Sequence, residues 1–265
     1  MVDCVTLWIG DSLGAVERAC LRSILRQGHS LALYCYDRLD GVPEGVEVRD
    51  AADVLPKEAI VRHRNGSAAL FSDWFRYELQ CRGLGTWLDV DNYLVAPLDM
   101  KEPYLFGKEI VDAPGFWRKP QRELIAAGVL RLPPTSPMLP SLVGLFDGRA
   151  VPDWTPSRWT PWYKFRGLIG YPPDLSDLPW GTAGPFAVDA LADRHGLSSL
   201  ALPSDVFNPV PWYEASWILN PAITLEQVVT ERTVSVHLCN DCIKDFKNDP
   251  APTGSFLERL QSEGA

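Results

Sequence analysis

The amino-acid sequence predicts an α/β protein with a mostly parallel central sheet flanked by helices. Two observations carry this prediction. The chain opens with an apolar strand pattern, a helical pattern and a second apolar strand pattern, and such a unit joins parallel strands through a covering helix. Strand and helix patterns then alternate along the 265 residues, with no internal repeat and no low-complexity segment. We therefore expect a single domain that spans residues 1–265.

The first half of the chain supplies most of the predicted sheet. An apolar run at residues 2–9 predicts a buried strand, and apolar residues at helical spacing predict the helix that follows it. Gly28 ends that helix, and a second apolar run begins directly after it. In chain order we expect a strand at 2–9, a helix at 14–27, strands at 31–36 and 46–49, a helix at 67–82 and a strand that begins at residue 86.

The second half begins with an irregular stretch. Residues 101–180 are rich in proline, which predicts a loop-rich region. Further on, a helix is expected to open at Pro185 and to close at Gly196, because proline suits the first helical turn and glycine the residue after the last. The other expected elements are a strand at 128–133, a helix at 138–147, strands at 200–203 and 234–239, and a charged C-terminal helix.

The composition argues against several classes of function. A net charge of −9 and a sequence pI of about 5.0 disfavour nucleic acid or an anionic membrane as the main partner. The sequence has no apolar stretch of about 18 residues and no signal-peptide pattern. We therefore expect a cytoplasmic protein without a transmembrane segment, and peripheral membrane contact stays open. The six cysteines are scattered, and the Cys239-x-x-Cys242 pair lacks the second pair typical of structural zinc.

Two carboxylates lie one residue apart in the stretch GTWLDVDNYLVAPLD, residues 85–99. Residues two apart on a strand point to the same side, so Asp89 and Asp91 can face one spot. Two anions held together repel each other unless a cation lies between them, which favours a divalent metal site. The alternative is a strand that ends in a polar turn, where aspartate is common. The pair alone does not decide between these interpretations.

A second charged pair precedes this motif on the helix expected at 67–82. Asp73 and Arg76 are three residues apart and therefore share a helix face. Their fixed donors and acceptors suit the neighbouring hydroxyls of a sugar. The alternative is a solvated ion pair worth about a few tenths of a kcal/mol, and both interpretations stay open on local grounds.

The segment FSDWFRYELQCRGLGTWLDVD resembles the S-D-x-x-R-x-x-x-L-x-x-x-G-G-x-Y-x-D-x-D block of a group of glycosyltransferases. This group includes capsular-polysaccharide enzymes, α-1,4-glycosyltransferases and the sugar-transferring domain of large clostridial toxins. The residues that match the block in order and interval are Ser72, Asp73, Arg76, Leu79, Gly83, Gly85, Asp89 and Asp91. Leu84 is inserted between the glycines, and Trp87 replaces the usual tyrosine. The resemblance implies a GT-A fold.

Two further segments resemble the nucleoside-binding parts of the same group. Leu7-Trp8-Ile9 ends the first expected strand and is similar to a segment whose tryptophan stacks on the base of the donor. An indole offers the flat apolar face that this contact needs, and a core tryptophan is the alternative. Tyr36-Asp37 follows the second strand and is similar to a Y-D pair that borders the nucleoside.

Two segments of the second half also match. The stretch WGTAGP resembles a G-T-x-G-P turn that opens a helix beneath donor and acceptor, and it contains Thr182 and Gly184. His237 matches the histidine of an H-x-W-N stretch that lies near metal and diphosphate, although Cys239 replaces the tryptophan. The asparagines that relatives carry before the strand at 128–133 are missing here, which leaves the sugar preference undefined.

The resemblance implies a retaining, metal-dependent transfer of a sugar from a nucleotide-sugar donor to a glycan or small-molecule acceptor, in bacterial surface polysaccharide synthesis. The donor would be a UDP-sugar in the first place and a GDP-sugar in the second. Mn²⁺ or Mg²⁺ would bind mainly to Asp91, with Asp89 at the ribose or a bound water and His237 beside them. The full set of implied catalytic and donor-binding residues is Leu7, Trp8, Ile9, Tyr36, Asp37, Asp73, Arg76, Asp89, Val90, Asp91, Thr182 and Gly184. Residues 101–180 would lie on the acceptor side.

Aromatic and basic residues gather late in that region, namely Trp154, Arg158, Trp159, Trp162, Tyr163, Lys164, Phe165 and Arg166. Stacking on sugar rings predicts an acceptor-facing role for some of them, and packing of a long loop onto the core is the alternative. Two histidines outside the region, His29 and His63, have polar sequence neighbours and are expected at the surface.

Two other classes of function stay open. WLDVDNYLV also resembles the D-x-D strand end of haloacid-dehalogenase phosphatases, in which the first aspartate is the nucleophile. Tyr93 departs from that pattern, and the motif normally lies near the N-terminus. The other class is a glycosyltransferase-like module that binds a sugar or nucleotide without turnover, and the intact charged motifs argue against it.

Overall fold

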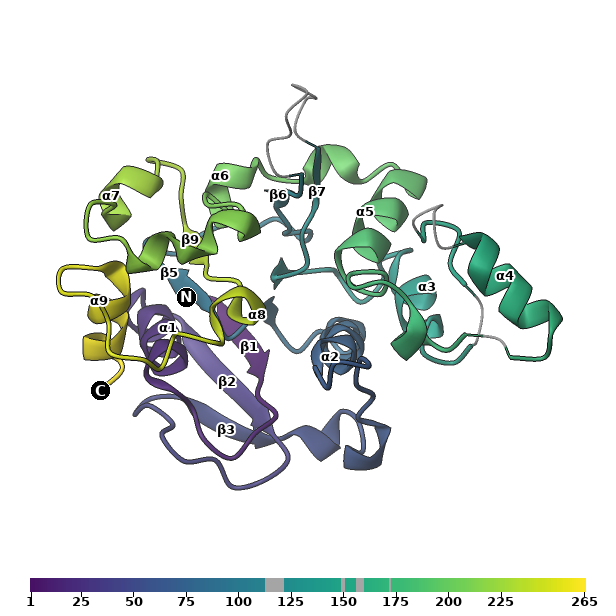
Figure 1. Ribbon diagram of the computed structural model, residues 1–265, viewed down its shortest axis with the longest axis horizontal. Helices are drawn as coiled ribbons and strands as arrows, with labels where there is room; N and C mark the ends of the chain where they lie inside the picture. Colours follow the sequence, from purple (N-terminus) through teal and green to yellow (C-terminus); the bar gives the residue numbers. More distant parts are fainter. Residues whose placement is uncertain (113–121, 149–150, 156–159, 172) are drawn as a thin grey trace.

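The computed structural model describes residues 1–112, 122–148, 151–155, 160–171 and 173–265. Its centre is a five-stranded sheet in the order β3–β2–β1–β4–β8 (Figure 1). Strands β1 to β4 run parallel to their neighbours, and the edge strand β8 is antiparallel. The bounds are β1 Asp3–Leu7, β2 Ser30–Cys35, β3 Glu47–Asp50, β4 Thr86–Leu88 and β8 Val129–Leu130. The prediction of an α/β fold with a mostly parallel sheet flanked by helices is confirmed.

Both faces of the sheet are covered, because successive side chains point to opposite sides. On one face Leu88 packs in a cluster with Ile24 of α1. On the other face its neighbour Trp87 packs in a cluster with Phe75 of α2. The helices have the bounds α1 Ala15–Arg26 and α2 Ala69–Cys81. Burial on both sides explains why the strands are continuous apolar runs in the sequence.

Two short antiparallel sheets accompany the main one. β5 (Asn92–Leu94) pairs with β9 (Ser235–His237), and β6 (Lys108–Ile110) pairs with β7 (Glu123–Ile125). In the first pair Asn92 lies opposite His237. A segment from the last part of the chain thus returns to the residue that directly follows the paired aspartates.

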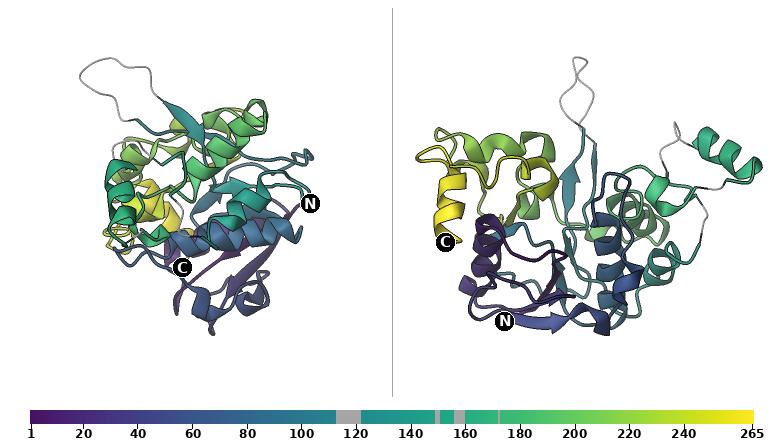
Figure 2. Two further views of the ribbon diagram at one scale, coloured as in Figure 1. Left: turned by 90° about the vertical axis from the view of Figure 1, so that its right-hand side faces the viewer. Right: turned by 60° about the horizontal axis from the view of Figure 1, so that its bottom comes forward.

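The remaining helices are α3 Leu139–Gly144, α4 Thr160–Leu168, α5 Pro185–Arg194, α6 Ser204–Phe207, α7 Leu225–Val228, α8 Asn240–Ile243 and α9 Phe256–Glu263. α9 packs against α1, and α5 packs against α3 and β7. α4 lies at the far end of the molecule from α9, away from the sheet (Figures 1 and 2). Within the described parts of the chain, no helix is long and apolar enough to cross a membrane.

The predicted elements of the first half are confirmed to within two residues at each end. In the second half the strand predicted at 200–203 is wrong. A 3₁₀ turn at Ser198–Leu200 occupies its start, and Pro203, which cannot donate to a ladder, leads into α6. The predicted strand at 128–133 shortens to β8, and the helix at 138–147 shortens to α3.

The prediction that His29 lies at the surface is also wrong. His29 is 5% exposed, and its Nε2 accepts a hydrogen bond from the backbone N–H of Leu98 at 2.8 Å. The ring satisfies a buried backbone donor that is remote in the sequence, so polar sequence neighbours could not reveal it. His63 is half-buried, with its ring centroid 4.9 Å from that of Trp180.

The aromatic-rich stretch contains a helix, α4, where the sequence predicted an irregular loop. Tyr163 is buried, in line with the packing alternative, whereas Trp162 and Phe165 are about half exposed. Arg158 and Trp159 lie outside the described residues.

Candidate functional site

The candidate site lies where the order of the parallel strands reverses. The chain runs from β1 outward to β2 and β3 and then returns to place β4 on the other side of β1. In open α/β sheets, ligands bind outside the carboxyl ends of the strands at such a reversal. The register pairs Val5 with Trp87, so its continuation sets Leu7 at the level of Asp89. Trp8 and the paired aspartates therefore lie at the carboxyl ends of the neighbouring strands β1 and β4.

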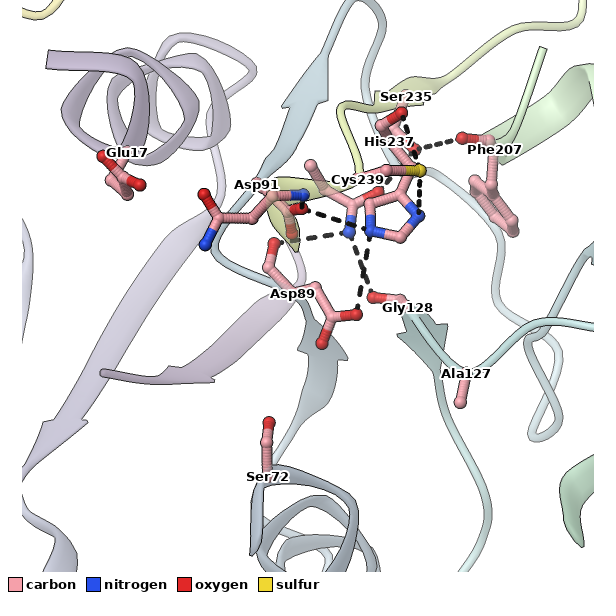
Figure 3. A network of polar contacts seen from close by, with 12 residues as sticks. Glu17, Ser72, Asp89, Asp91, Ala127, Gly128, Phe207, Ser235, His237 and Cys239 are labelled. Carbon is pink, nitrogen blue, oxygen red and sulfur yellow. Dashed lines mark hydrogen bonds and ion pairs between the residues drawn. The ribbon is translucent and has the colours of Figure 1, made fainter. Parts of the chain in front are cut away.

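Asp89, Asp91 and His237 form a compact group at this edge (Figure 3). Nε2 of His237 lies 3.4 Å from a carboxylate oxygen of Asp91 and 3.9 Å from one of Asp89. One ligand atom from each residue lies within 4.8 Å of the other two. Two carboxylates and an imidazole suit a borderline-hard divalent cation such as Mn²⁺. The structure thus brings together the three residues that the resemblance implied for metal.

Backbone hydrogen bonds hold the two aspartates in place. The N–H of Asn240 donates to the carboxylate of Asp91 at 2.5 Å. The N–H of Leu238 donates to the backbone carbonyl of Asp91 at 3.0 Å. The N–H of Asp89 donates to the carbonyl of Gly128 at 2.8 Å. A Cβ on Gly128 would lie 3.2 Å from a carboxylate oxygen of Asp89. Glycine at this position therefore leaves room for the acidic pair.

The Asp73–Arg76 pair belongs to the same cluster and is not solvated. The guanidinium of Arg76 is 3.4 Å from Asp73 and 3.1 Å from Asp89, and it also donates to the carbonyl of Ala127. It stacks over Trp87 at 4.9 Å, and the indole N–H of Trp87 donates to Asp89 at 2.8 Å. Trp87 therefore orients both a carboxylate and a guanidinium of the site.

The environment separates the acidities of these carboxyls. Burial raises the pKa of Asp73 to about 7, and the attraction of Arg76 offsets only part of the effect. Burial also raises the pKa of Asp89, with Arg76 again opposing it. Burial would raise the pKa of Asp91 too, but His237 and the N–H of Asn240 outweigh it and lower the pKa to about 2. Without a metal, Asp91 is the carboxylate most firmly ionised.

The glycine-rich turn before α5 lies directly against this pair. A Cβ on Gly184 would come within 2.9 Å of both carboxylate oxygens of Asp73, so only glycine allows the approach. The hydroxyl of Tyr77 on α2 donates to the carbonyl of Ala183 at 2.7 Å and ties the turn to the helix. The Thr182 hydroxyl is buried and donates within the turn to Pro179 at 2.7 Å.

The residues expected at the nucleoside lie at the ends of β1 and β2 and are more open. Trp8 is half-buried, and its indole N–H donates to the carbonyl of Ser12 at 3.1 Å. Tyr36 donates from its hydroxyl to a backbone carbonyl at 2.8 Å. Asp37 forms an exposed ion pair with Lys57 at 2.7 Å.

Two parts of the surroundings were not predicted from the sequence. Glu109 on β6 is close enough to His237 and Asp89 to interact with their charges, and burial raises its pKa. Behind Asn240, the ammonium of Lys247 pairs with the buried carboxylate of Glu17 and donates to the Asn240 side chain. No motif marks these residues, because three separate chain segments meet there only in the folded protein.

Cys239 stands on the other side of the imidazole. Its sulfur lies 3.9 Å from Nδ1 of His237, and its φ of 56° is the left-handed conformation that favours glycine. The chain turns sharply at this residue and starts α8, which directs the N–H of Asn240 at Asp91. Cys239 thus serves a tight turn beside the site.

Comparison with protein-family models and with curated proteins gives no match. Among solved structures, one described as "PaToxG Glycosyltransferase" is similar, with a TM-score of 0.41 and 11% sequence identity. The similarity covers 75% of this chain and 71% of that chain. Since this likeness is loose, the functional assignment rests on the geometry of the site.

Proposed function

We propose that this chain is a metal-dependent glycosyltransferase of the GT-A type, acting as one catalytic domain over residues 1–265. The donor is a nucleotide sugar, with UDP first and GDP second, and the acceptor is a glycan or a small molecule. The observation that carries the proposal is the convergence of Asp89, Asp91 and His237 with the buried Asp73–Arg76 pair at one strand end. The retaining outcome and a place in bacterial surface polysaccharide synthesis come from the sequence resemblance.

The charge of the cluster supports a cation site. Asp89 and Asp91 both lie beside the imidazole of His237, and two carboxylates held together favour a positive charge between them. When bound between Asp89, Asp91 and His237, Mn²⁺ or Mg²⁺ would neutralise charge on the diphosphate as it leaves. Arg76 and Asp73 would hold the hydroxyls of the donor sugar, since both are kept in fixed orientations by buried contacts. Trp8 would offer a stacking face for the base, and Val90 would line the donor between the two aspartates.

The phosphatase alternative needs Asp89 as a free nucleophile. One oxygen of that carboxylate instead accepts the indole N–H of Trp87 and pairs with Arg76, and the other faces His237. These contacts favour a holding role over an attacking one. Release of a nucleoside diphosphate from a nucleotide sugar distinguishes the transferase from a phosphatase that acts on a small phosphate ester.

The proposal is tested by thermal unfolding with UDP, GDP, CMP and their common sugars, each with and without Mn²⁺. A ligand at one hundred times its Kd adds about 2.7 kcal/mol to the free energy of unfolding, so binding is readily seen. We expect one nucleoside diphosphate to stabilise the protein only when metal is present. The same panel on Asp91→Asn should give no metal-dependent shift, while Asp99→Asn, an exposed aspartate nearby, should behave as the wild type. If no nucleotide stabilises the wild type under either condition, the proposal is wrong.

A further inference from the structure

Exposed apolar side chains are concentrated in one short segment. Of the ten large hydrophobic residues that are exposed in the described chain, five lie between residues 162 and 171. Their exposed fractions are 55% for Trp162, 50% for Phe165, 87% for Leu168, 52% for Ile169 and 69% for Tyr171. Scattered exposed apolar residues need no explanation, but a contiguous group marks an interaction surface.

Three of these side chains, Trp162, Phe165 and Leu168, lie on α4, and Ile169 and Tyr171 directly follow its last turn. Trp162, Phe165 and Ile169 follow each other at spacings of three and four residues, and Leu168 extends the same stripe. The rings of Trp162 and Phe165 stack with centroids 6.0 Å apart. The helix is held to the protein from its other side, where the hydroxyl of Tyr163 donates to the carbonyl of Asp177 at 2.8 Å.

The position of α4 leaves this face open to a large partner. The helix lies at one end of the molecule, on the opposite side from α9 and beyond α3 and α5 (Figures 1 and 2). Arg166 forms an ion pair with Asp177 at 2.8 Å and fixes the end of the helix next to the segment that leads to Thr182. The apolar stripe is therefore connected to the glycine-rich turn at Asp73 by a short, anchored stretch of chain.

The sequence of the stripe is locally basic, in contrast to the acidic chain, although Arg166 and Arg64 share the carboxylate of Asp177. Residues 154–173 contain Arg158, Lys164 and Arg166 and no carboxylate, in a chain with a net charge of −9. Aromatic and aliphatic side chains on one helix face, flanked by cations, are typical of helices that lie in the headgroup region of a membrane. A glycan would be met by aromatic rings alone, whereas Leu168 and Ile169 offer aliphatic surface.

We propose that the α4 face, formed by Trp162, Phe165, Leu168, Ile169 and Tyr171, docks on the surface of an anionic lipid bilayer. Docking buries the apolar stripe among the acyl chains near the headgroups and brings Lys164 to the lipid charge. The inference is independent of the metal and of the donor. It adds a location to the proposed function, because α4 belongs to residues 101–180, which the sequence resemblance assigns to the acceptor side.

The test is co-sedimentation of the full chain with vesicles of phosphatidylcholine alone and with one-third phosphatidylglycerol, at low salt. We expect binding to the anionic vesicles and at least about tenfold weaker binding to the neutral ones. Leu168→Glu combined with Ile169→Glu should abolish binding. Lys164→Gln should reduce only the preference for anionic lipid.

The matched control is Val48→Glu, which places the same charge at a residue that is 52% exposed on β3, far from α4 (Figure 1). It should bind vesicles as the wild type does. Absence of binding in the wild type, or equal binding by the Leu168/Ile169 double variant, overturns the proposal. So does a dimer in light scattering that the double variant converts to a monomer without any lipid, since a second copy would then cover the face.

Discussion

The acidic cluster, formed by Asp73, Arg76, Asp89, Asp91 and His237, buries charged side chains, whereas the α4 face exposes apolar ones. In the cluster, charged groups such as Asp73, Arg76 and Asp91 are each at least nine-tenths buried. On α4, Leu168 is 87% exposed while the charges around it are few. Buried charges and exposed apolar patches are the informative exceptions to ordinary burial. In the two proposals a partner completes each region, a cation and nucleotide in one case and a lipid surface in the other.

The two regions are also organised by different physical means. The cluster is preorganised, because each polar group has partners within the protein before any ligand binds. The α4 face is anchored on its inner side by Tyr163 and Arg166, whereas its outer side is exposed, with the rings of Trp162 and Phe165 stacked on each other. Substitutions should therefore change the chemistry and the folding energy in the cluster, but mainly association on α4.

The largest effect is expected from Asp91→Asn, which keeps the shape of the side chain and removes its charge. Turnover of a nucleotide sugar should fall by at least about a hundredfold, comparable to the loss of a single charge-stabilising group in other enzymes. The rate of nucleoside diphosphate release measures it, with Asp99→Asn as the control. If turnover stays within a factor of about three of the wild type, Asp91 does not bind a metal needed for the reaction. The proposed contrast between a cation-binding cluster and a lipid-binding face then fails.

A large effect on folding is expected from Lys247→Met. The substitution leaves the carboxylate of Glu17 buried without its partner, which costs about 3–5 kcal/mol of unfolding free energy in comparable pairs. Asn240 also loses a side-chain contact, so Mn²⁺ affinity should fall about tenfold. Urea unfolding and electron paramagnetic resonance of free Mn²⁺ measure the two effects.

Two control variants distinguish the folding effect from the positioning effect. Lys244→Met removes an exposed lysine and should change neither quantity. Glu17→Gln combined with Lys247→Met removes the unpaired charge and should recover most of the stability but not the Mn²⁺ affinity. Recovery of both would show that Lys247 contributes to folding alone.

Asp73→Asn is expected to raise the free energy of unfolding, and by less than Lys247→Met lowers it. The pKa of Asp73 is raised to about 7 in the folded protein, so the ionised form destabilises the fold. The stability that this group contributes is complete near pH 4 and is lost as the pH rises through 7. In metal-free buffer at pH 8, the free energy of unfolding of the variant should therefore be about 2–4 kcal/mol higher than that of the wild type. At pH 4 the two proteins should be equally stable. A variant that is less stable at pH 8 would contradict the assigned direction.

The resemblance to glycosyltransferases supplied the residues of the acidic cluster, whereas the sequence patterns alone predicted the sheet and the helices α1, α2 and α5. These depend on local patterns, because apolar periodicity and glycine positions reflect the immediate environment of each residue. Asp89 follows β4 and Asp91 lies in the turn before β5, and two residues so near in the chain stay close in space whatever the rest of the chain does. The failed predictions, a strand at 200–203 and a surface position for His29, concern residues whose partners, Gly107 and Leu98, lie far away in the chain.

The tertiary structure decided what surrounds the motif. Only the pairing of β5 with β9 brings His237 to the aspartates, and only packing of α1 near α8 brings Glu17 and Lys247 behind Asn240. The exposure of the α4 face likewise follows from where that helix lies, since the same aromatic residues could have filled the core. Side-chain type and spacing are local properties and can be obtained from the sequence. Burial and charge pairing depend on contacts between distant segments, which form only when the chain folds.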